Sequence, residues 1–240
     1  MQSETVEPQA PQTEELSAFQ RVVGVFTSPG KTFASIDRKP GWILPVVLST
    51  IISVGFIVAV QPVLIQETLS KQEQKMQERG MDSDQIDQIL ATTEKAMKYT
   101  TPAFALIMPV IIIVVISAVF LFVGNVVLGG SAPFKKVMSV TAHSWLILSL
   151  GSLVAIPLIL AKETMQVSFS LATLMSESAR ETFLYQLLSK IDVFAVWTLA
   201  ALSIGLAVIY KMKTQKMATA VVTTYLIYAL VASVFSSAFS

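Results

Sequence analysis

Few residues of this chain could do chemistry, and they lie within or at the ends of long apolar runs. His143 is the only histidine, and Asn125, Asp192 and Trp197 are the other candidate functional residues. An ionisable group inside a membrane is costly and often marks a substrate path or a proton relay. The pattern nevertheless favours structural roles: a hydrogen bond to a neighbouring helix for His143 and a helix N-cap for Asp192. Asp192 can also serve both as a cap and as a ligand site.

The residue sets that intramembrane enzymes require are missing from the sequence. An intramembrane aspartyl protease needs two facing acidic residues, and Asp192 is the only acidic residue within an apolar run, at its edge. A zinc protease needs the two histidines of a His-Glu-x-x-His motif, whereas the chain has one histidine and no cysteine. We therefore expect a protein that is not an enzyme, with no catalytic residue, no cofactor and no metal site.

A run near the N-terminus is similar to a phosphate-binding loop but departs from it. Residues 24–32 end in Gly-Lys-Thr, yet five residues separate Gly24 from Gly30, where a phosphate-binding loop has four. Pro29 also removes one of the backbone amides that would face a phosphate. The formal net charge of +1 provides no basic face for nucleic acid. We expect neither a nucleotide nor a nucleic acid as a partner.

The elements that carry these residues are five apolar runs, each about as long as a transmembrane helix. A bilayer core about 30 Å thick needs roughly 20 apolar residues in a helix. The runs cover residues 43–65, 102–128, 137–161, 191–210 and 218–239. The composition agrees, since 53% of the residues are hydrophobic and 14% are charged, with a mean hydropathy of +0.66. The sequence predicts an all-α integral membrane protein, a bundle of five transmembrane helices.

The region before the first run has two parts. Residues 1–13 are rich in Glu, Gln, Pro and Thr, a composition typical of disorder. Residues 14–41 predict two short amphipathic helices, the second of which begins at Ser28 and Pro29. The basic residues beside their apolar faces are Arg21, Lys31, Arg38 and Lys39. These helices either lie on an anionic membrane surface through those basic residues or pack on the end of the bundle.

Two connections between the runs are too long to be simple loops. The polarity predicts that the first helix continues beyond its apolar run to Gly80, after which Asp82 or Ser83 can cap a second helix. A helical hairpin is therefore expected to extend from the bundle. Residues 162–190 predict a re-entrant or interfacial helix pair, of which residues 183–188 lead into the fourth span.

The loops also predict an orientation. The short loops 129–136 and 211–216 contain five basic residues and no acidic one, a density typical of the cytoplasmic side. An odd number of spans places the two termini on opposite sides of the membrane. We therefore expect a protein of the cell inner membrane with a cytoplasmic N-terminus, an external C-terminus and an external hairpin.

Several segments occur together in a distinctive order. They are Val25-Phe26-Thr27-Ser28-Pro29-Gly30-Lys31-Thr32-Phe33, Pro40-Gly41-Trp42 to Pro45, Gly130-Ser131-Ala132-Pro133-Phe134-Lys135, Leu188 to Trp197, and Leu202-Ser203-Ile204-Gly205-Leu206-Ala207. In this order, from about residue 16 onward, the chain resembles the bacterial branch of the Yip family (Ypt-interacting-protein, or Yip-one, domain). The resemblance implies a five-span membrane domain over residues 42–240 and a cytosolic N-terminus. Eukaryotic relatives are linked to Rab-type GTPases and vesicle traffic, but this chain lacks their long cytosolic domain, so Rab binding is not carried over.

Two functions fit these expectations. The first is a non-enzymatic scaffold or accessory subunit that organises a membrane complex or the local bilayer, with the lipid bilayer and a homo-oligomer or other membrane proteins as partners. The second is a transporter or lipid-moving protein with a polar path near His143, Asn125 and Asp192. A cavity that reaches His143 or Asp192 would favour transport, whereas a self-complementary face would favour scaffolding.

Overall fold

Five helices that are long and apolar enough to cross a membrane form the body of the protein, as the sequence predicts. The computed structural model describes residues 15–167 and 169–238, so the predicted disorder of residues 1–13 and the last residue of the fifth predicted span lie outside the described residues. The long helices are α3 (Ile43–Glu78), α4 (Ser83–Phe122), α5 (Phe134–Lys162), α7 (Val193–Tyr210) and α8 (Thr214–Ala238). The shorter elements are α1 (Ala18–Thr27), α2 (Pro29–Arg38), α6 (Phe183–Ser189), a π-helical turn (Val123–Val127) and two 3-10 turns (Leu171–Leu174 and Glu177–Ala179).

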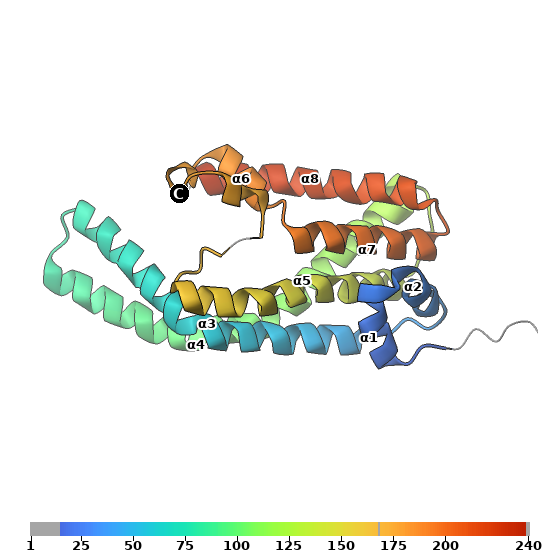
Figure 1. Ribbon diagram of the computed structural model, residues 1–240, viewed down its shortest axis with the longest axis horizontal. Helices are drawn as coiled ribbons and strands as arrows, with labels where there is room; N and C mark the ends of the chain where they lie inside the picture. Colours follow the sequence, from blue (N-terminus) through green and yellow to red (C-terminus); the bar gives the residue numbers. More distant parts are fainter. Residues whose placement is uncertain (1–14, 168, 239–240) are drawn as a thin grey trace, which may run out of the picture.

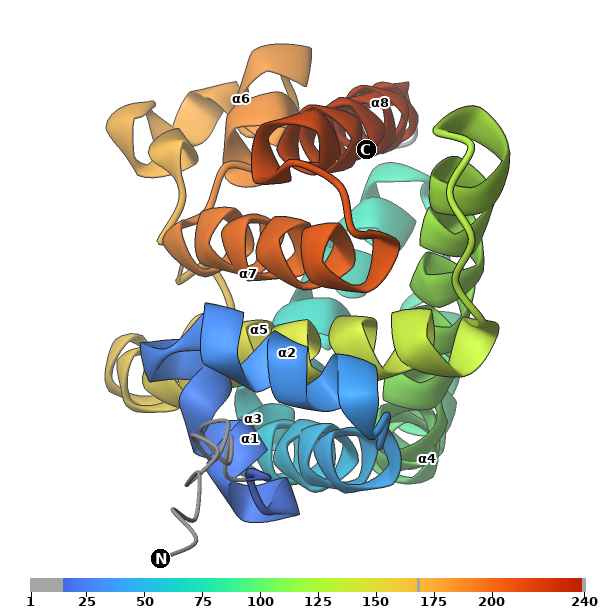
Figure 2. The ribbon, with the colours of Figure 1, turned by 90° about the vertical axis from the view of Figure 1, so that its right-hand side faces the viewer.

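The long helices are stacked in layers with α5 in the middle (Figure 1). Helix α3 packs on α4 and α5, while α7 packs on α5 and α8. Seen from the end in Figure 2, α7 and α8 lie on one side of α5 and α3 lies on the other. In the described part of the chain, α4 and α8 share no extensive interface. The body therefore consists of two helix groups, which are joined mainly where α5 meets α7.

The two N-terminal helices pack on one end of this bundle. A capping box starts α1, in which the Gln20 amide donates to Ser17 Oγ at 3.2 Å. Helix α2 lies across α5 and α7, and Figure 2 shows it in front of α5. Phe33, Ile36 and Val25 are completely buried in the main core cluster. The structure thus shows packing on the bundle end, while contact of the outer faces with a membrane surface stays a prediction.

At the opposite end, α3 and α4 continue past their apolar runs as a helical hairpin (Figure 1). Gly80, with φ of +69°, follows the end of α3 in the left-handed conformation that glycine favours. Asp82 caps α4 by accepting a hydrogen bond from the Asp84 amide at 2.9 Å. Gln61 of α3 ties the two helices together by donating to Thr101 Oγ1 of α4 at 3.0 Å. The predicted hairpin and its cap are therefore present.

The segment before α7 differs from its prediction. It contains two 3-10 turns and the short helix α6, which packs on α8. Helix α6 ends at Ser189 and α7 begins at Val193, so residues 183–188 do not continue into the fourth span. Residues 183–188 thus precede the fourth span as a separate short helix, and Asp192 caps the start of α7 after a break of three residues.

Candidate functional site

Asp192 is the N-cap of α7. Its Oδ1 accepts hydrogen bonds from the Phe194 amide at 2.7 Å and the Ala195 amide at 3.2 Å, two of the donors that a helix start leaves without partners. Asp192 also forms an isolated antiparallel bridge with Ser170. In the same turn, Tyr225 of α8 donates its hydroxyl to the carbonyl of Lys190 at 2.5 Å. Three interactions therefore hold the break between α6 and α7: the cap, the bridge to Ser170 and the hydrogen bond from Tyr225.

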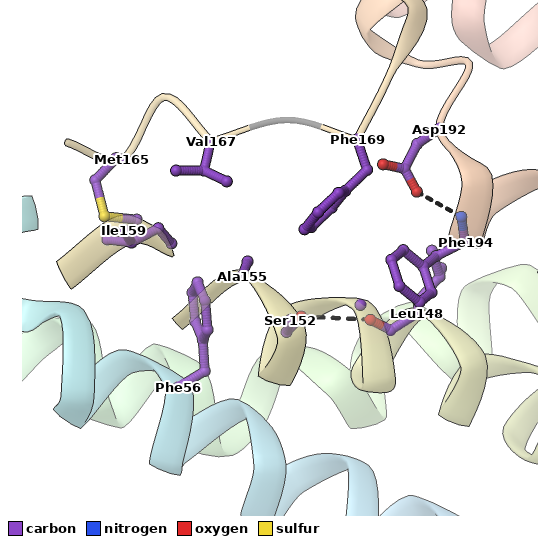
Figure 3. A pocket seen from close by; sticks show the side chains of 11 residues that line it. Phe56, Leu148, Ser152, Ala155, Ile159, Met165, Val167, Phe169, Asp192 and Phe194 are labelled. Atoms are coloured by element: carbon purple, nitrogen blue, oxygen red, sulfur yellow. Dashed lines mark hydrogen bonds between the residues drawn. The ribbon is translucent and has the colours of Figure 1, made fainter. Parts of the chain in front are cut away.

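Asp192 also lies at the edge of an open cavity of 260 Å³, which is lined by α5, the segment before α7 and Phe56 of α3 (Figure 3). The rings of Phe169 and Phe194 meet edge to face beside the carboxylate, with their centroids 5.6 Å apart. Gly151 of α5 permits this packing, since a Cβ atom there would lie 2.8 Å from Phe194 Cγ. Figure 3 shows one carboxylate oxygen on the Phe194 amide and the other on the side of Phe169. The cavity can therefore hold an apolar group whose polar end donates to Asp192.

His143 lies in a different cavity, of 450 Å³, near the end of the bundle that carries α1 and α2. Its side chain is 1% exposed, and Nδ1 donates to the carbonyl of Ser139 at 2.7 Å, because a carbonyl can only accept. The sequence led us to expect a bond to a neighbouring helix, but the partner lies one turn earlier in α5. The ring therefore bonds within its own helix. Arg21 of α1 lines the same cavity.

Asn125 closes the loop between α4 and α5. Its Nδ2 donates to the carbonyl of Ala132, its Oδ1 accepts from the amide of Ala132, and both distances are 3.1 Å. Nearby, the ring of Tyr210 packs on Gly124, and its hydroxyl donates to the carbonyl of Phe120 at 3.4 Å, beside the π-helical turn. Both ends of the Asn125 amide are thus engaged by the loop.

Trp197 connects α7 to the N-terminal helices. Its ring meets Phe26 of α1 edge to face, with the centroids 5.9 Å apart, and it packs against the main core cluster. This geometry gives Trp197 a packing role between α1 and α7.

The four basic residues predicted at the membrane surface differ in their exposure. Lys31, Arg38 and Lys39 are exposed, whereas Arg21, which we predicted at the membrane surface with them, is buried at 6% exposure. Arg21 Nη1 donates to the carbonyl of Lys39 at 2.6 Å. The reason for the difference is that this face of α1 packs toward α5 and the start of α3. An amphipathic pattern alone does not show which of its polar residues will face inward.

A third cavity, of 560 Å³, lies between α4 and α8, and we call it the α4–α8 cleft. Its floor comes from α5 and α7, and its walls are mostly aliphatic. The polar side chains that line it are Thr141, Ser144, Thr198, Thr224, Tyr225 and Tyr228. Ser144 Oγ is buried and has no hydrogen-bond partner among the described residues. The sequence did not lead us to predict this cleft. The only sequence pattern that indicates it is the spacing of Thr224, Tyr225 and Tyr228 on one side of the fifth span.

Comparison with protein families identifies the relatives of the chain. A model of the Yip1 domain matches residues 23–236. The chain belongs to the Yip1 domain family. The match begins within α1 and ends within α8, so the Yip1 domain here includes α2, the hairpin and the α4–α8 cleft. Comparisons with curated proteins and with solved structures give no significant match.

The polar residues predicted from the sequence are not brought together in this Yip1 domain. Asp192 and His143 line separate cavities, and Asn125 lines neither of them. Each of the three uses its side chain in a local bond with backbone groups. The apolar α4–α8 cleft has a greater volume than the cavities at Asp192 and His143, and none of the three residues lines it.

Proposed function

We propose that this Yip1 domain protein is a non-enzymatic scaffold of the cell inner membrane that binds lipid acyl chains in the α4–α8 cleft and so organises the local bilayer. The observation that carries the proposal is the cleft, an apolar cavity of 560 Å³ lined by four spanning helices. This volume is within the roughly 300–1,000 Å³ of typical small-ligand sites. The surrounding bilayer supplies acyl chains whose chemistry matches the walls of the cleft.

An acyl chain fits this cleft better than a helix of a partner protein. Helices pack closely in membranes through small residues at the interface, and an α-helix with side chains is about 10–12 Å wide. The sides of the cleft instead carry bulky residues such as Ile111, Val115 and Val119. A thin and flexible chain can enter between such side chains, whereas a helix cannot approach the backbone behind them.

A matched pair of substitutions on α8 tests the proposal. Thr224 lines the cleft, while its neighbour Thr223 is exposed on another face of the same helix. We expect Thr224→Trp to fill the cleft and to reduce the lipid that copurifies in mild detergent by more than half, as measured by mass spectrometry of the intact protein. Thr223→Trp should leave the bound lipid unchanged. Equal lipid retention by both variants would contradict acyl-chain binding in the cleft.

The proposed scaffold has two further attributes that experiments can address. It associates with a second copy or with other membrane proteins, so a strict monomer after crosslinking in native membranes would count against it. Its N-terminus is cytoplasmic and its C-terminus external. Because the chain has no cysteine, single cysteines placed at Ser131 and Ser70 can be labelled in intact cells. Labelling of Ser131→Cys by an impermeant reagent, with protection of Ser70→Cys, would reverse this orientation.

A transporter or lipid-moving protein is the second candidate function. The observation in its favour is that Asp192 and His143 each line a cavity within or beside the bundle. This candidate expects labelled lipid or a solute to cross proteoliposomes faster than empty liposomes. Movement at the rate of empty liposomes, for protein in both orientations, would count against transport and leave the scaffold unaffected.

A further inference from the structure

The cavity at His143 is enclosed by parts of the chain that lie far apart in sequence. It measures 450 Å³, and its lining comes from α1, the linker between α2 and α3, the first turns of α3, and α5. Lys135 is exposed at the start of α5, and His143 is buried two turns further along the same helix, a rise of about 12 Å. The cavity therefore extends from the surface of the bundle end toward a buried floor.

The charged groups of this cavity are all basic. Arg21 and Lys135 line it together with His143, and no acidic residue is among its lining residues. The Arg21 side chain is 6% exposed, and its Nε has no hydrogen-bond partner in the part of the chain that the structure describes. A buried cation without a counter-ion is costly. An anion in the cavity would offset this cost.

Two carboxylates at this end of the molecule pair with lysines other than Lys135. Asp37 of α2 pairs with Lys136 of α5, and Glu15 lies 3.7 Å from the Nζ of Lys39. Among the described residues, the Arg21 guanidinium donates a hydrogen bond only to the backbone carbonyl of Lys39. No carboxylate in the described part of the chain pairs with the Arg21 guanidinium, so a bound anion would neutralise its charge.

The remaining wall of the cavity is apolar and faces outward. It consists of Trp42 and the first turn of α3, where Ile43 is 64% exposed and Val47 is 46% exposed. Tryptophan is enriched at the level of lipid headgroups. A free inorganic anion would need no such wall, whereas a phospholipid presents a phosphate and acyl chains side by side.

We propose that this cavity binds the phosphate group of an anionic phospholipid, with Arg21 and Lys135 pairing with the phosphate and the acyl chains lying along Trp42, Ile43 and Val47. Guanidinium and ammonium groups form strong charge-assisted hydrogen bonds with phosphate, and basic pockets between membrane helices suit lipid headgroups. The site is separate from the α4–α8 cleft, and it adds selection by headgroup charge to the proposed acyl-chain binding.

Titration of the full-length protein with two lipids of identical chains tests this site. In mild detergent, native mass spectrometry should show phosphatidylglycerol binding at least about tenfold more tightly than phosphatidylcholine. Lys135→Gln and Arg21→Gln should each weaken phosphatidylglycerol binding by about tenfold, the effect of losing one charged hydrogen bond. Lys213→Gln is the control, since Lys213 is an exposed lysine in the loop after α7 and its loss changes the net charge equally.

Three results would overturn the proposal. The first is equal binding of the two lipids by the wild-type protein. The second is a Lys135→Gln variant that binds phosphatidylglycerol no more weakly than Lys213→Gln does, and this variant decides the matter even where Arg21→Gln fails to fold. The third is displacement of bound phosphatidylglycerol by millimolar inorganic phosphate, which would assign the site to a free anion. Failure of the cleft variants alone would leave this headgroup site standing.

Discussion

Helix α2 packs tightly on α5 and α7 at one end of the bundle, whereas the region between α4 and α8 is open. At the packed end, Phe33 and Ile36 of α2 are completely buried among α5 and α7. Between α4 and α8, four helices line a cavity of 560 Å³. The two regions therefore suit different roles. The packing of α2 fixes the helices relative to one another, and the open region can admit lipid without disturbing that packing.

A glycine in α7 allows α2, α5 and α7 to pack closely. A Cβ atom at Gly205 of α7 would lie 2.5 Å from Val140 Cγ1 and 2.9 Å from Phe33 Cδ1. The missing side chain therefore lets α2 and α5 approach the backbone of α7, and such close approach replaces the hydrophobic driving force that lipid does not provide. The α4–α8 cleft has bulky residues on its sides, and its helices remain apart.

The largest expected effect is the loss of Phe33. Its side chain has 0% exposure, and replacing a buried phenylalanine with alanine costs about 3–5 kcal/mol. We expect Phe33→Ala to lower the free energy of unfolding by about that amount, measured by denaturant or thermal unfolding in detergent. Phe19→Ala removes the same side chain from α1 where it is 69% exposed, and it should change stability by well under 1 kcal/mol. Similar effects from both variants would mean that the packing of α2 on the bundle does not stabilise the protein.

Much of this framework follows from the sequence. Apolar runs with almost no charge predict the five spans, and Gly80 followed by Asp82 predicts the hairpin. Each pattern is local, because a span needs length and a turn or cap needs one residue type. Asp192 could likewise be predicted as a cap. The extension of α3 beyond its apolar run was also predicted, because the helical pattern continues to Gly80.

The sites were harder to predict because they depend on contacts between distant segments. Arg21 has the sequence pattern of a surface residue, and only the packing of α1 buries it. Asn125 was expected to contribute to a polar path, yet its partner Ala132 lies seven residues away in the same loop. The α4–α8 cleft combines residues of four helices, and no local pattern specifies that α4 and α8 stay apart.

Gly124 offers a smaller test of the packed end. A Cβ atom there would overlap the ring of Tyr210, and overpacking typically costs about 1–3 kcal/mol. Gly124→Ala should therefore lower the unfolding midpoint in detergent. Gly55→Ala makes the same change in α3, where nothing lies within 4 Å of the new atom, and it should be neutral or stabilising because alanine favours helix. Opposite signs for the two variants would show that the glycine at position 124 is needed for close packing, and equal signs would contradict this.

The smallest expected effect, at Asp192, separates a structural role from a ligand role. Losing an N-cap costs about 1 kcal/mol, and asparagine caps nearly as well as aspartate. Asp192→Ala should thus lower stability by about that amount, whereas Asp192→Asn should retain it, because an amide oxygen can still accept from Phe194 and Ala195. If the carboxylate only caps α7, Asp192→Asn will also keep any lipid movement seen in proteoliposomes. If instead the second carboxylate oxygen beside Phe169 binds a ligand, Asp192→Asn will stay as stable as wild type and lose that movement, and the cavity at Asp192 will then have a chemical task separate from acyl-chain binding in the α4–α8 cleft.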